Sequence, residues 1–145
     1  MSAAAVPPGW TVLAGTLQGE GGFGAVNGPF WERARPGEDG GGVDIAFLVG
    51  KQHLNPNGIV HGGMLMTFVD QALGAAVWRS IDRKPCATIT LNCNFLAPAK
   101  LGDWLEARTE ITRRGRSVVF AGGRIRCGDR VLLTAEGVWK VLGTT

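Results

Sequence analysis

One segment constrains the fold of this chain more than any other, because residues 62–79 would be apolar on nearly every side of a helix. A helix without a polar face is buried inside its protein. At about 1.5 Å per residue, this one would be about 27 Å long. Thr67, Asp70 and Gln71 interrupt the apolar run, so the segment is too short and too polar to span a membrane. We therefore expect one long buried helix.

Segments with strand character lie on both sides of this helix in the sequence. One precedes the helix and four follow it: 43–49, 86–96, 104–112, 117–127 and 130–141. Arg114-Gly115 and Gly128-Asp129 are suited to hairpin turns between the last three. A single apolar helix of this length needs a curved sheet round it. The expected fold is therefore α+β, with an antiparallel β-sheet wrapped round one central helix.

The strand expected at 86–96 has a clear period of two. Its odd-numbered positions from 87 to 95 are apolar, and its even-numbered positions carry Thr88, Thr90, Asn92 and Asn94. This alternation is typical of a strand that is buried on one face only. We therefore expect Thr88 on the polar face.

The length of 145 residues fits a single domain, 1–145, with one core. Residues 1–42 form a glycine-rich N-terminal segment that we expect to be loosely organised, and 43–141 form the core. Gly19, Gly21 and Gly24 match the GxGxxG spacing of phosphate-binding loops. The Gly28-Pro29 pair that follows does not allow a helix to open well, so a plain loop is favoured.

Composition argues against several classes of function. A net charge of +3 is too small to indicate a nucleic-acid partner. Three cysteines without a CxxC pair suit neither a disulfide framework nor a zinc site, and no HxxxH or HxH spacing occurs. The N-terminus lacks the features of a signal peptide. We therefore expect a cytoplasmic protein with reduced thiols and without a metal or cofactor.

The motif His61-Gly62-Gly63 stands at the start of the expected helix. The first N–H groups of a helix have no partner within it and lie at the positive end of its dipole. Glycines let a ligand approach these groups, where they can stabilise an oxyanion. Close packing at a tight helix entry explains the glycines equally well.

Asp70 lies two turns into the same helix, among apolar neighbours. A carboxylate there is costly to bury without a partner. Thr67, Asp70 and Gly74 share one side of the helix, which can face a cleft or a subunit interface. Asp70 is therefore our candidate for a catalytic base or nucleophile, and the alternative is a structural carboxylate held by a strand side chain.

Other polar residues have two interpretations each. Asn55 can donate its amide to a carbonyl group or cap a turn. Arg113, Arg114 and Arg116 can bind the phosphates of a nucleotide or form a solvated hairpin tip. No serine stands in a G-x-S-x-G context, which argues against a serine hydrolase.

The string at 53–63, HLNPNGIVHGG, followed by Asp70, resembles the signature of the PaaI-type branch of hotdog-fold thioesterases. Residues 94–103 and 113–116 are similar to further landmarks of that family. The resemblance covers about 43–141 and implies a hotdog fold. It also implies hydrolysis of acyl-CoA at sites built between the subunits of a homodimer or homotetramer.

The resemblance also implies roles for individual residues. Gly62 would supply the oxyanion N–H, and Asn55 and His61 would help to place the thioester. Asp70 would reach in from the partner subunit to activate water or attack directly, with the Thr88 hydroxyl nearby. The N-terminal segment has no counterpart in the family signature, and its Phe30 and Trp31 are candidates to line the acyl pocket.

Two other functions are compatible with these residues. A hotdog hydratase or dehydratase would use His61 and Asp70 as a pair for proton transfer, although the spacing from His61-Gly62-Gly63 to Asp70 argues against it. A non-catalytic acyl-CoA-binding module is the second alternative, although such proteins usually add a DNA-binding segment, which 1–42 does not resemble.

Overall fold

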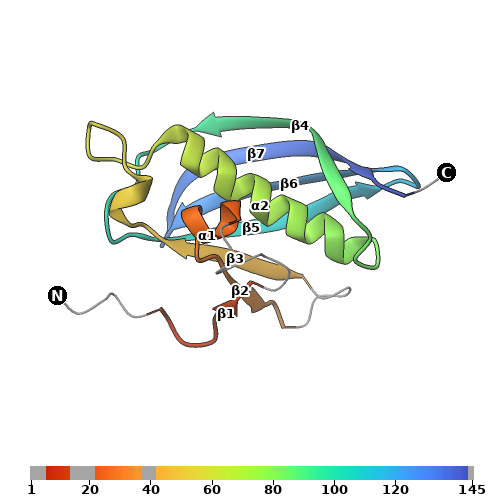
Figure 1. The fold of residues 1–145 in the computed structure, drawn as a ribbon, viewed down its shortest axis with the longest axis horizontal. Helices are drawn as coiled ribbons and strands as arrows, with labels where there is room; N and C mark the ends of the chain where they lie inside the picture. Colours follow the sequence, from red (N-terminus) through yellow and green to blue (C-terminus); the bar gives the residue numbers. More distant parts are fainter. Residues whose placement is uncertain (1–5, 14–21, 37–41, 144–145) are drawn as a thin grey trace.

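The computed structural model, which describes residues 6–13, 22–36 and 42–143, contains one seven-stranded sheet wrapped round one long helix (Figure 1). Every strand pair in the sheet is antiparallel. The strands are β1 (Thr11–Val12), β2 (Trp31–Ala34), β3 (Val43–Leu48), β4 (Cys86–Phe95), β5 (Trp104–Arg114), β6 (Val118–Cys127) and β7 (Arg130–Val141). The helices are α1 (Phe23–Asn27), the 3₁₀ turn η1 (Lys51–His53) and α2 (Gly62–Ser80). This confirms the α+β arrangement.

The order of strands in the sheet is β1-β2-β3-β5-β6-β7-β4. After α2 the chain therefore crosses to the far edge, where β4 pairs with β7 and not with β5, the next strand in sequence. The helix α2 lies across one face of the sheet (Figure 1). One consequence of the crossing is that β4 has a described neighbour on one side only.

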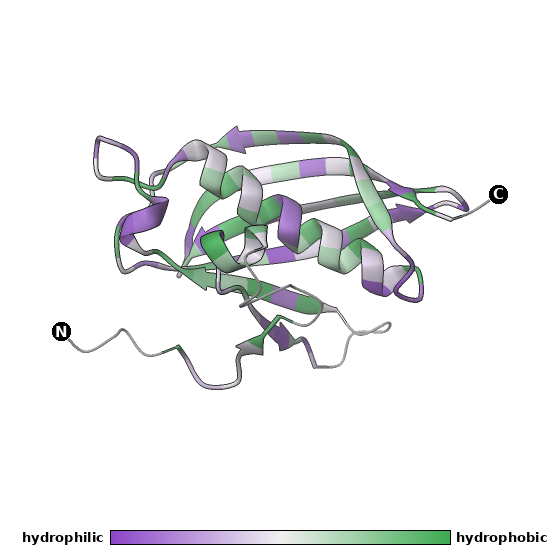
Figure 2. Cartoon of the chain, in the orientation of Figure 1, coloured by the Kyte–Doolittle hydropathy of each residue, from purple (hydrophilic) through white to green (hydrophobic). Residues whose placement is uncertain are grey.

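The helix α2 is buried on one side, not on every side as its composition predicted. Its sheet-facing side includes Phe68, Leu73 and Val77, which have no exposed surface. The opposite side is partly exposed, and Met66 there is 36% exposed. A hydrophilic band crosses α2 about midway along its length, at Asp70 and Gln71 (Figure 2). A single chain therefore leaves one side of this apolar helix uncovered.

The alternation predicted for β4 is interrupted by a β-bulge. The pairing register of β4 with β7 shifts between Thr88 and Thr90. Before the bulge Thr88 faces α2, and after it Leu91 and Cys93 pack against the core. The prediction that Thr88 lies on the polar face with Thr90 is therefore wrong, because an extra residue in one strand reverses the order of faces.

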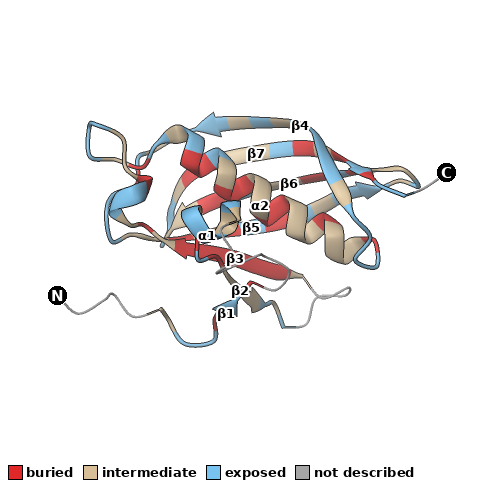
Figure 3. Ribbon diagram, viewed as in Figure 1, coloured by how far each residue is buried: buried red, intermediate tan, exposed pale blue. Residues whose placement is uncertain are grey.

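Most of β4 is exposed on both faces (Figure 3). The exposed fractions of Ile89 and Phe95 are 53% and 51%. The expectation of a half-buried strand is therefore not met within one chain. An unpaired edge strand that carries exposed apolar side chains is a site for association.

The N-terminal segment is more ordered than its glycine content predicted. The strand β2 pairs with β3, and β1 pairs with β2, so this segment extends the sheet. Phe30 is fully buried, with its ring 6.0 Å from Phe68 and 6.2 Å from Phe47. Phe30 is thus a core residue and not part of an acyl pocket, whereas Trp31 is half-buried on β2. Of the GxGxxG glycines, Gly19 and Gly21 lie outside the described residues.

Among the described residues, no helix combines the length and the apolar content needed to cross a bilayer. In the same part of the chain, no three His, Cys, Asp or Glu side chains are grouped to hold a metal ion.

His53 ties the N-terminal segment to the loop that precedes α2. Its Nδ1 accepts a hydrogen bond from Gly50 N–H at 2.9 Å, so the proton lies on Nε2, which donates to Asn27 O at 2.8 Å. The ring packs edge-on against Phe47 at 5.0 Å. Burial lowers the pKa of His53, and the hydrogen bond to Asn27 O opposes this effect. His53 is therefore a structural histidine.

We expect the stability of the fold to decrease as the pH is lowered through the range in which free histidine titrates. Because the His53 pKa is lower in the folded than in the unfolded chain, the unfolded chain binds more protons. The stabilisation is fully present above pH about 6.5 and is lost as the pH falls below it. The measurement is the free energy of unfolding by urea between pH about 7.5 and about 5.5.

The variant His53→Gln should weaken this slope, whereas His61→Gln, at the other histidine, should keep it. An equal slope in the wild-type and His53→Gln proteins would contradict the assignment to His53.

Candidate functional site

Asp70 of α2 and Thr88 of β4 are in direct contact. Thr88 Oγ1 donates a hydrogen bond to Asp70 Oδ1 at 2.7 Å. The other carboxylate oxygen, Oδ2, has no partner among the described residues. One oxygen thus orients the carboxylate, and the other is available to a ligand or a water molecule. This contact depends on the β-bulge, which turns Thr88 toward the helix.

Two thiols lie near the carboxylate, and sequence reasoning did not place them there. Cys86 Sγ lies 3.9 Å from Gly74 O, one turn beyond Asp70 on α2. Burial, and then the negative charge of Asp70, raise the pKa of Cys86 and of Cys93. A raised pKa keeps both thiols protonated and poorly nucleophilic. Neither thiol is therefore a candidate nucleophile.

The N-terminus of α2 is capped by its own motif. His61 is the N-cap, and its Nδ1 accepts a hydrogen bond from Gly63 N–H at 2.8 Å. The N–H groups of Met64 and Leu65 donate to His61 O at 2.9 Å and 3.2 Å. The N–H of Gly62 has no acceptor among the described residues. The motif therefore leaves one donor open, not several.

The open donor lies beside an aromatic ring that sequence reasoning also missed. A Cβ placed on Gly62 would lie 3.5 Å from Phe95 Cε1 and 3.8 Å from Phe95 Cζ. No sequence signal distinguishes Phe95 from the other apolar positions of its strand, because it alternates as they do. The Phe95 ring is thus a neighbour of the residue whose N–H group is open.

Asn55 forms the turn before the helix. Its Oδ1 accepts from Asn57 N–H at 2.9 Å and from Ile59 N–H at 3.3 Å. This contact fits the structural interpretation given for the residue. Its Nδ2 has no partner among the described residues and can still donate.

Gly62 and Asp70 are too far apart within one chain to act on the same atom. They are eight residues apart on one helix, which corresponds to about 12 Å along its axis. The structure therefore brings Asp70 together with Thr88, and Gly62 together with His61, at two separate places on α2.

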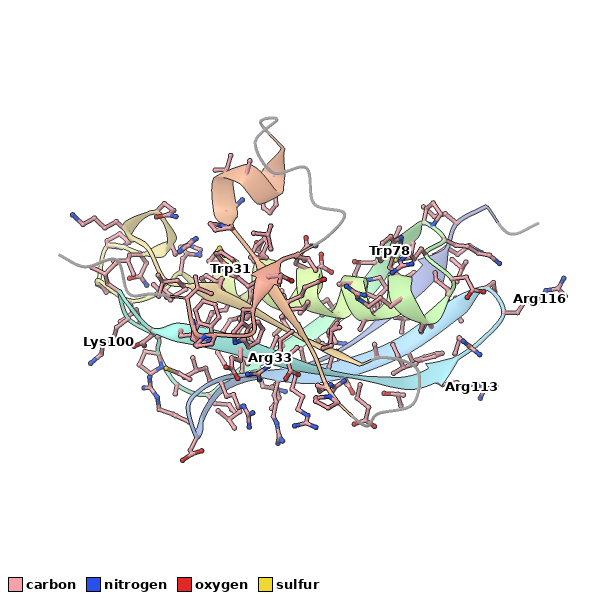
Figure 4. The ribbon with its side chains drawn as sticks, turned by 90° about the horizontal axis from the view of Figure 1, so that it is seen from below. Trp31, Arg33, Trp78, Lys100, Arg113 and Arg116 are labelled. Carbon is pink, nitrogen blue, oxygen red and sulfur yellow. The ribbon has the colours of Figure 1, made fainter. Side chains whose placement is uncertain are left out.

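The arginine cluster at the β5–β6 hairpin is divided between two roles. Arg114 Nη1 donates to Ser80 O at 2.6 Å and so caps the C-terminus of α2. Arg113 and Arg116 extend from the hairpin tip away from the body of the protein (Figure 4). Only these two side chains are thus open to a ligand, and Arg114 has a structural role.

Comparison with known proteins identifies a family for this chain. The profile of the thioesterase superfamily matches residues 57–134. A Pseudomonas aeruginosa protein assigned as an esterase is 35% identical over 98 residues, which cover 67% of this chain and 73% of that protein. The structure of a Ralstonia eutropha protein, assigned as a thioesterase related to phenylacetic acid degradation, has a TM-score of 0.68 and 30% identity, covering 76% of this chain and 84% of that one.

A third similar protein is a Streptococcus pneumoniae protein assigned as a thioesterase and solved with coenzyme A. It has a TM-score of 0.66 and 27% identity, and the match covers 78% of this chain and 90% of that one. Two further structures of that protein each carry a single replacement by alanine, one of an aspartate and one of a threonine.

We expect the variant Asp70→Asn to make Cys86 and Cys93 more reactive. Part of the rise in their pKa comes from the charge of Asp70, so removing that charge increases the thiolate fraction at a given pH. Alkylation by iodoacetamide at pH about 8, followed by mass spectrometry, should therefore be a few-fold faster at both residues.

Thr88→Val is the matched control, because it removes the hydrogen bond but keeps the charge. Its alkylation rates should stay close to those of the wild-type protein. Unchanged rates in Asp70→Asn would mean that the carboxylate is not charged in the folded protein.

Proposed function

The chain belongs to the thioesterase superfamily, as a PaaI-like member of the hotdog-fold thioester hydrolases, and from this premise we propose that it hydrolyses acyl-CoA with Asp70 as the catalytic carboxylate. The observation that carries the proposal is a half-buried carboxylate with one oxygen fixed by Thr88 and the other open. The coenzyme A bound to the similar pneumococcal protein supports this class of substrate.

Asp70 can promote hydrolysis in two ways. As a general base it takes a proton from water while the water oxygen attacks the thioester carbon, and the CoA thiolate then leaves. As a nucleophile it attacks that carbon itself, the C–S bond breaks to release the CoA thiolate, and water then hydrolyses the resulting anhydride. Both routes need the negative charge. Thr88 acts through Asp70 by holding Oδ1, so it is a positioning residue.

Gly62 is the proposed oxyanion donor. Its N–H group is open at the positive end of a 19-residue helix, where developing negative charge is stabilised. His61 fixes the geometry by capping Gly63, and its Nε2–H remains to contact the thioester. Asn55 Nδ2 is a second donor at this entry. A hydratase would instead use His61 and Asp70 as a pair for proton transfer, and it would alter the double bond of an enoyl thioester without releasing the thiol.

The separation along α2 supports a site built from two chains. Asp70 and Gly62 lie about 12 Å apart in one protomer, so both reach one thioester only if they come from different protomers. The uncovered edge of β4, with Ile89 and Phe95 half-exposed, supplies a surface for association. We therefore propose a homodimer at least, with α2 and β4 at the interface.

The phosphates of coenzyme A are the proposed ligands of Arg113 and Arg116. These side chains extend into solvent at the β5–β6 hairpin (Figure 4). Arg114, named with them from the sequence, reaches the C-terminus of α2 and would contribute mainly by holding the hairpin in place.

We expect Asp70→Asn to lower kcat for acyl-CoA by at least about 10²-fold, because it removes the charge and keeps the shape. Gly62→Pro should lower it by about 10²- to 10³-fold, because it removes the N–H group. Proline is compatible with the first helical position, and His61 already has the extended φ of −59° and ψ of 135° that a following proline requires. The measurement is thiol release over a panel of acyl-CoAs, with thermal melts alongside.

Mixing the two inactive chains tests the two-chain site. When they are co-expressed with different tags, about half of the dimers are mixed, and each mixed dimer has one site with both wild-type residues. About a quarter of the wild-type rate should therefore return. Asp129→Asn in the exposed β6–β7 turn is the matched control. Near-wild-type turnover of a folded Asp70→Asn protein would overturn the catalytic role, and no recovery on mixing would overturn the two-chain site.

We expect Arg116→Ala to raise KM by up to about tenfold and to leave kcat nearly unchanged, because phosphate contacts contribute uniform binding. High salt should reduce the difference. Arg130→Ala, at the other hairpin, is the control, because Arg130 is also exposed but is paired with Asp103. An unchanged KM in both Arg113→Ala and Arg116→Ala would show that these arginines form a solvated hairpin tip and do not bind the phosphates.

A further inference from the structure

A notch lies beside the catalytic carboxylate, on the same side of α2. Gly74 is one helical turn after Asp70, and its lack of a side chain leaves space there. Apart from the helix backbone, only one described atom lies within 4 Å of the position that a Cβ would take on Gly74, and that atom is Trp139 Nε1 at 3.7 Å. The notch therefore ends on the edge of an indole ring.

Trp139 is fixed in this position by its neighbours. It lies on β7, directly opposite Thr88 of β4, and is 1% exposed. A Cβ on Gly137 would lie 2.7 Å from Trp139 Cη2, so only glycine leaves room for the ring there. The Trp139 ring thus extends from Gly137 to Gly74, and its Nε1 lies next to Gly74.

The indole N–H has no hydrogen-bond partner among the described residues. The ring is buried, but Nε1 is not among the buried side-chain atoms that lack a partner, so the donor itself keeps a small solvent-accessible surface. An apolar group that covers this donor leaves it without an acceptor, which costs free energy. Tryptophan N–H groups usually find a partner when they are buried. In this position, a bound ligand is a natural source of the missing acceptor.

We propose that Trp139 is a specificity-determining residue whose N–H group selects acyl groups that carry a hydrogen-bond-accepting oxygen. The inference rests on the proposed function, which places the thioester carbon beside Asp70. Gly74 lies about 6 Å further along the helix, so the oxygen is expected about that far from the thioester carbon. A ketone or hydroxyl group at that distance satisfies the indole N–H, whereas a purely apolar chain leaves it unpaired.

The test compares two acyl-CoAs of equal size. One carries a ketone on the fifth carbon of a six-carbon chain, and the other carries a methyl branch on the same carbon. The wild-type protein should show a kcat/KM about tenfold higher for the ketone. The ketone oxygen accepts a hydrogen bond from the indole N–H, whereas the methyl branch leaves that N–H without an acceptor, and a difference of one hydrogen bond is of this size. Trp139→Phe keeps an aromatic ring but removes the N–H group, so its ratio should fall to about one.

A second variant leaves the buried Trp139 ring in place. Gly74→Ala places a methyl group in ordinary contact with Nε1, at 3.7 Å, and alanine favours the helix. The methyl group shields the N–H, so this variant should lose the preference, and a thermal melt checks that it is folded. Trp104→Phe is the matched control, because it makes the same replacement at an indole whose N–H already donates to Glu106 Oε1.

The outcomes separate this inference from the proposed function. Hydrolysis of both substrates with equal kcat/KM by the wild-type protein would overturn the role of Trp139 and leave the thioesterase intact. A preference that survives in both Trp139→Phe and Gly74→Ala would also overturn it. A purely structural role for Trp139 would lower both rates without changing their ratio. Hydrolysis of no acyl-CoA at all would overturn the proposed function and this inference together.

Discussion

The packing of one side of α2 against the curved sheet is the interaction on which the rest of the structure depends. Phe68, Leu73 and Val77 are fully buried on that side, and each such side chain contributes about 1.5–3 kcal/mol on burial. Because this side is fixed, the rotation of the helix about its axis is fixed too. Asp70 and Gly74 then face β4 as a consequence of core packing, with no separate interaction needed to aim them.

The edge strand β4 serves the site because it is incompletely paired. Its bulge reverses the order of faces and brings Thr88 onto Asp70, at the cost of a regular ladder. Its exposed Ile89 and Phe95 are unfavourable in an isolated chain and favourable at an interface. In the proposed two-chain site, the same edge therefore orients the carboxylate and recruits the partner.

The helix also connects two kinds of polar chemistry that lie about 12 Å apart. The first N–H groups of a helix have no partner within it. At the start of α2, the His61 side chain accepts from the N–H of Gly63, and the N–H of Gly62 stays available. At its middle, the Thr88 hydroxyl holds one oxygen of Asp70 and leaves the other available. In both places a neighbouring side chain occupies one hydrogen-bonding group of the site, and a second group stays available to a substrate.

From residue 43 onward, local sequence patterns were enough to predict the long helix and the strands, and they also supplied the candidate site residues; the strands β1 and β2 were not predicted. The apolar run at 62–79 and the period of two after it are local patterns, and the strands and helix begin and end within about two residues of the prediction. The tertiary structure alone decided three things: that β4 pairs with β7, that Thr88 faces α2, and that Trp139 reaches Gly74. These are contacts between segments far apart in the sequence. No local pattern encodes them, because a one-residue bulge or a change of strand order reverses faces without altering the composition.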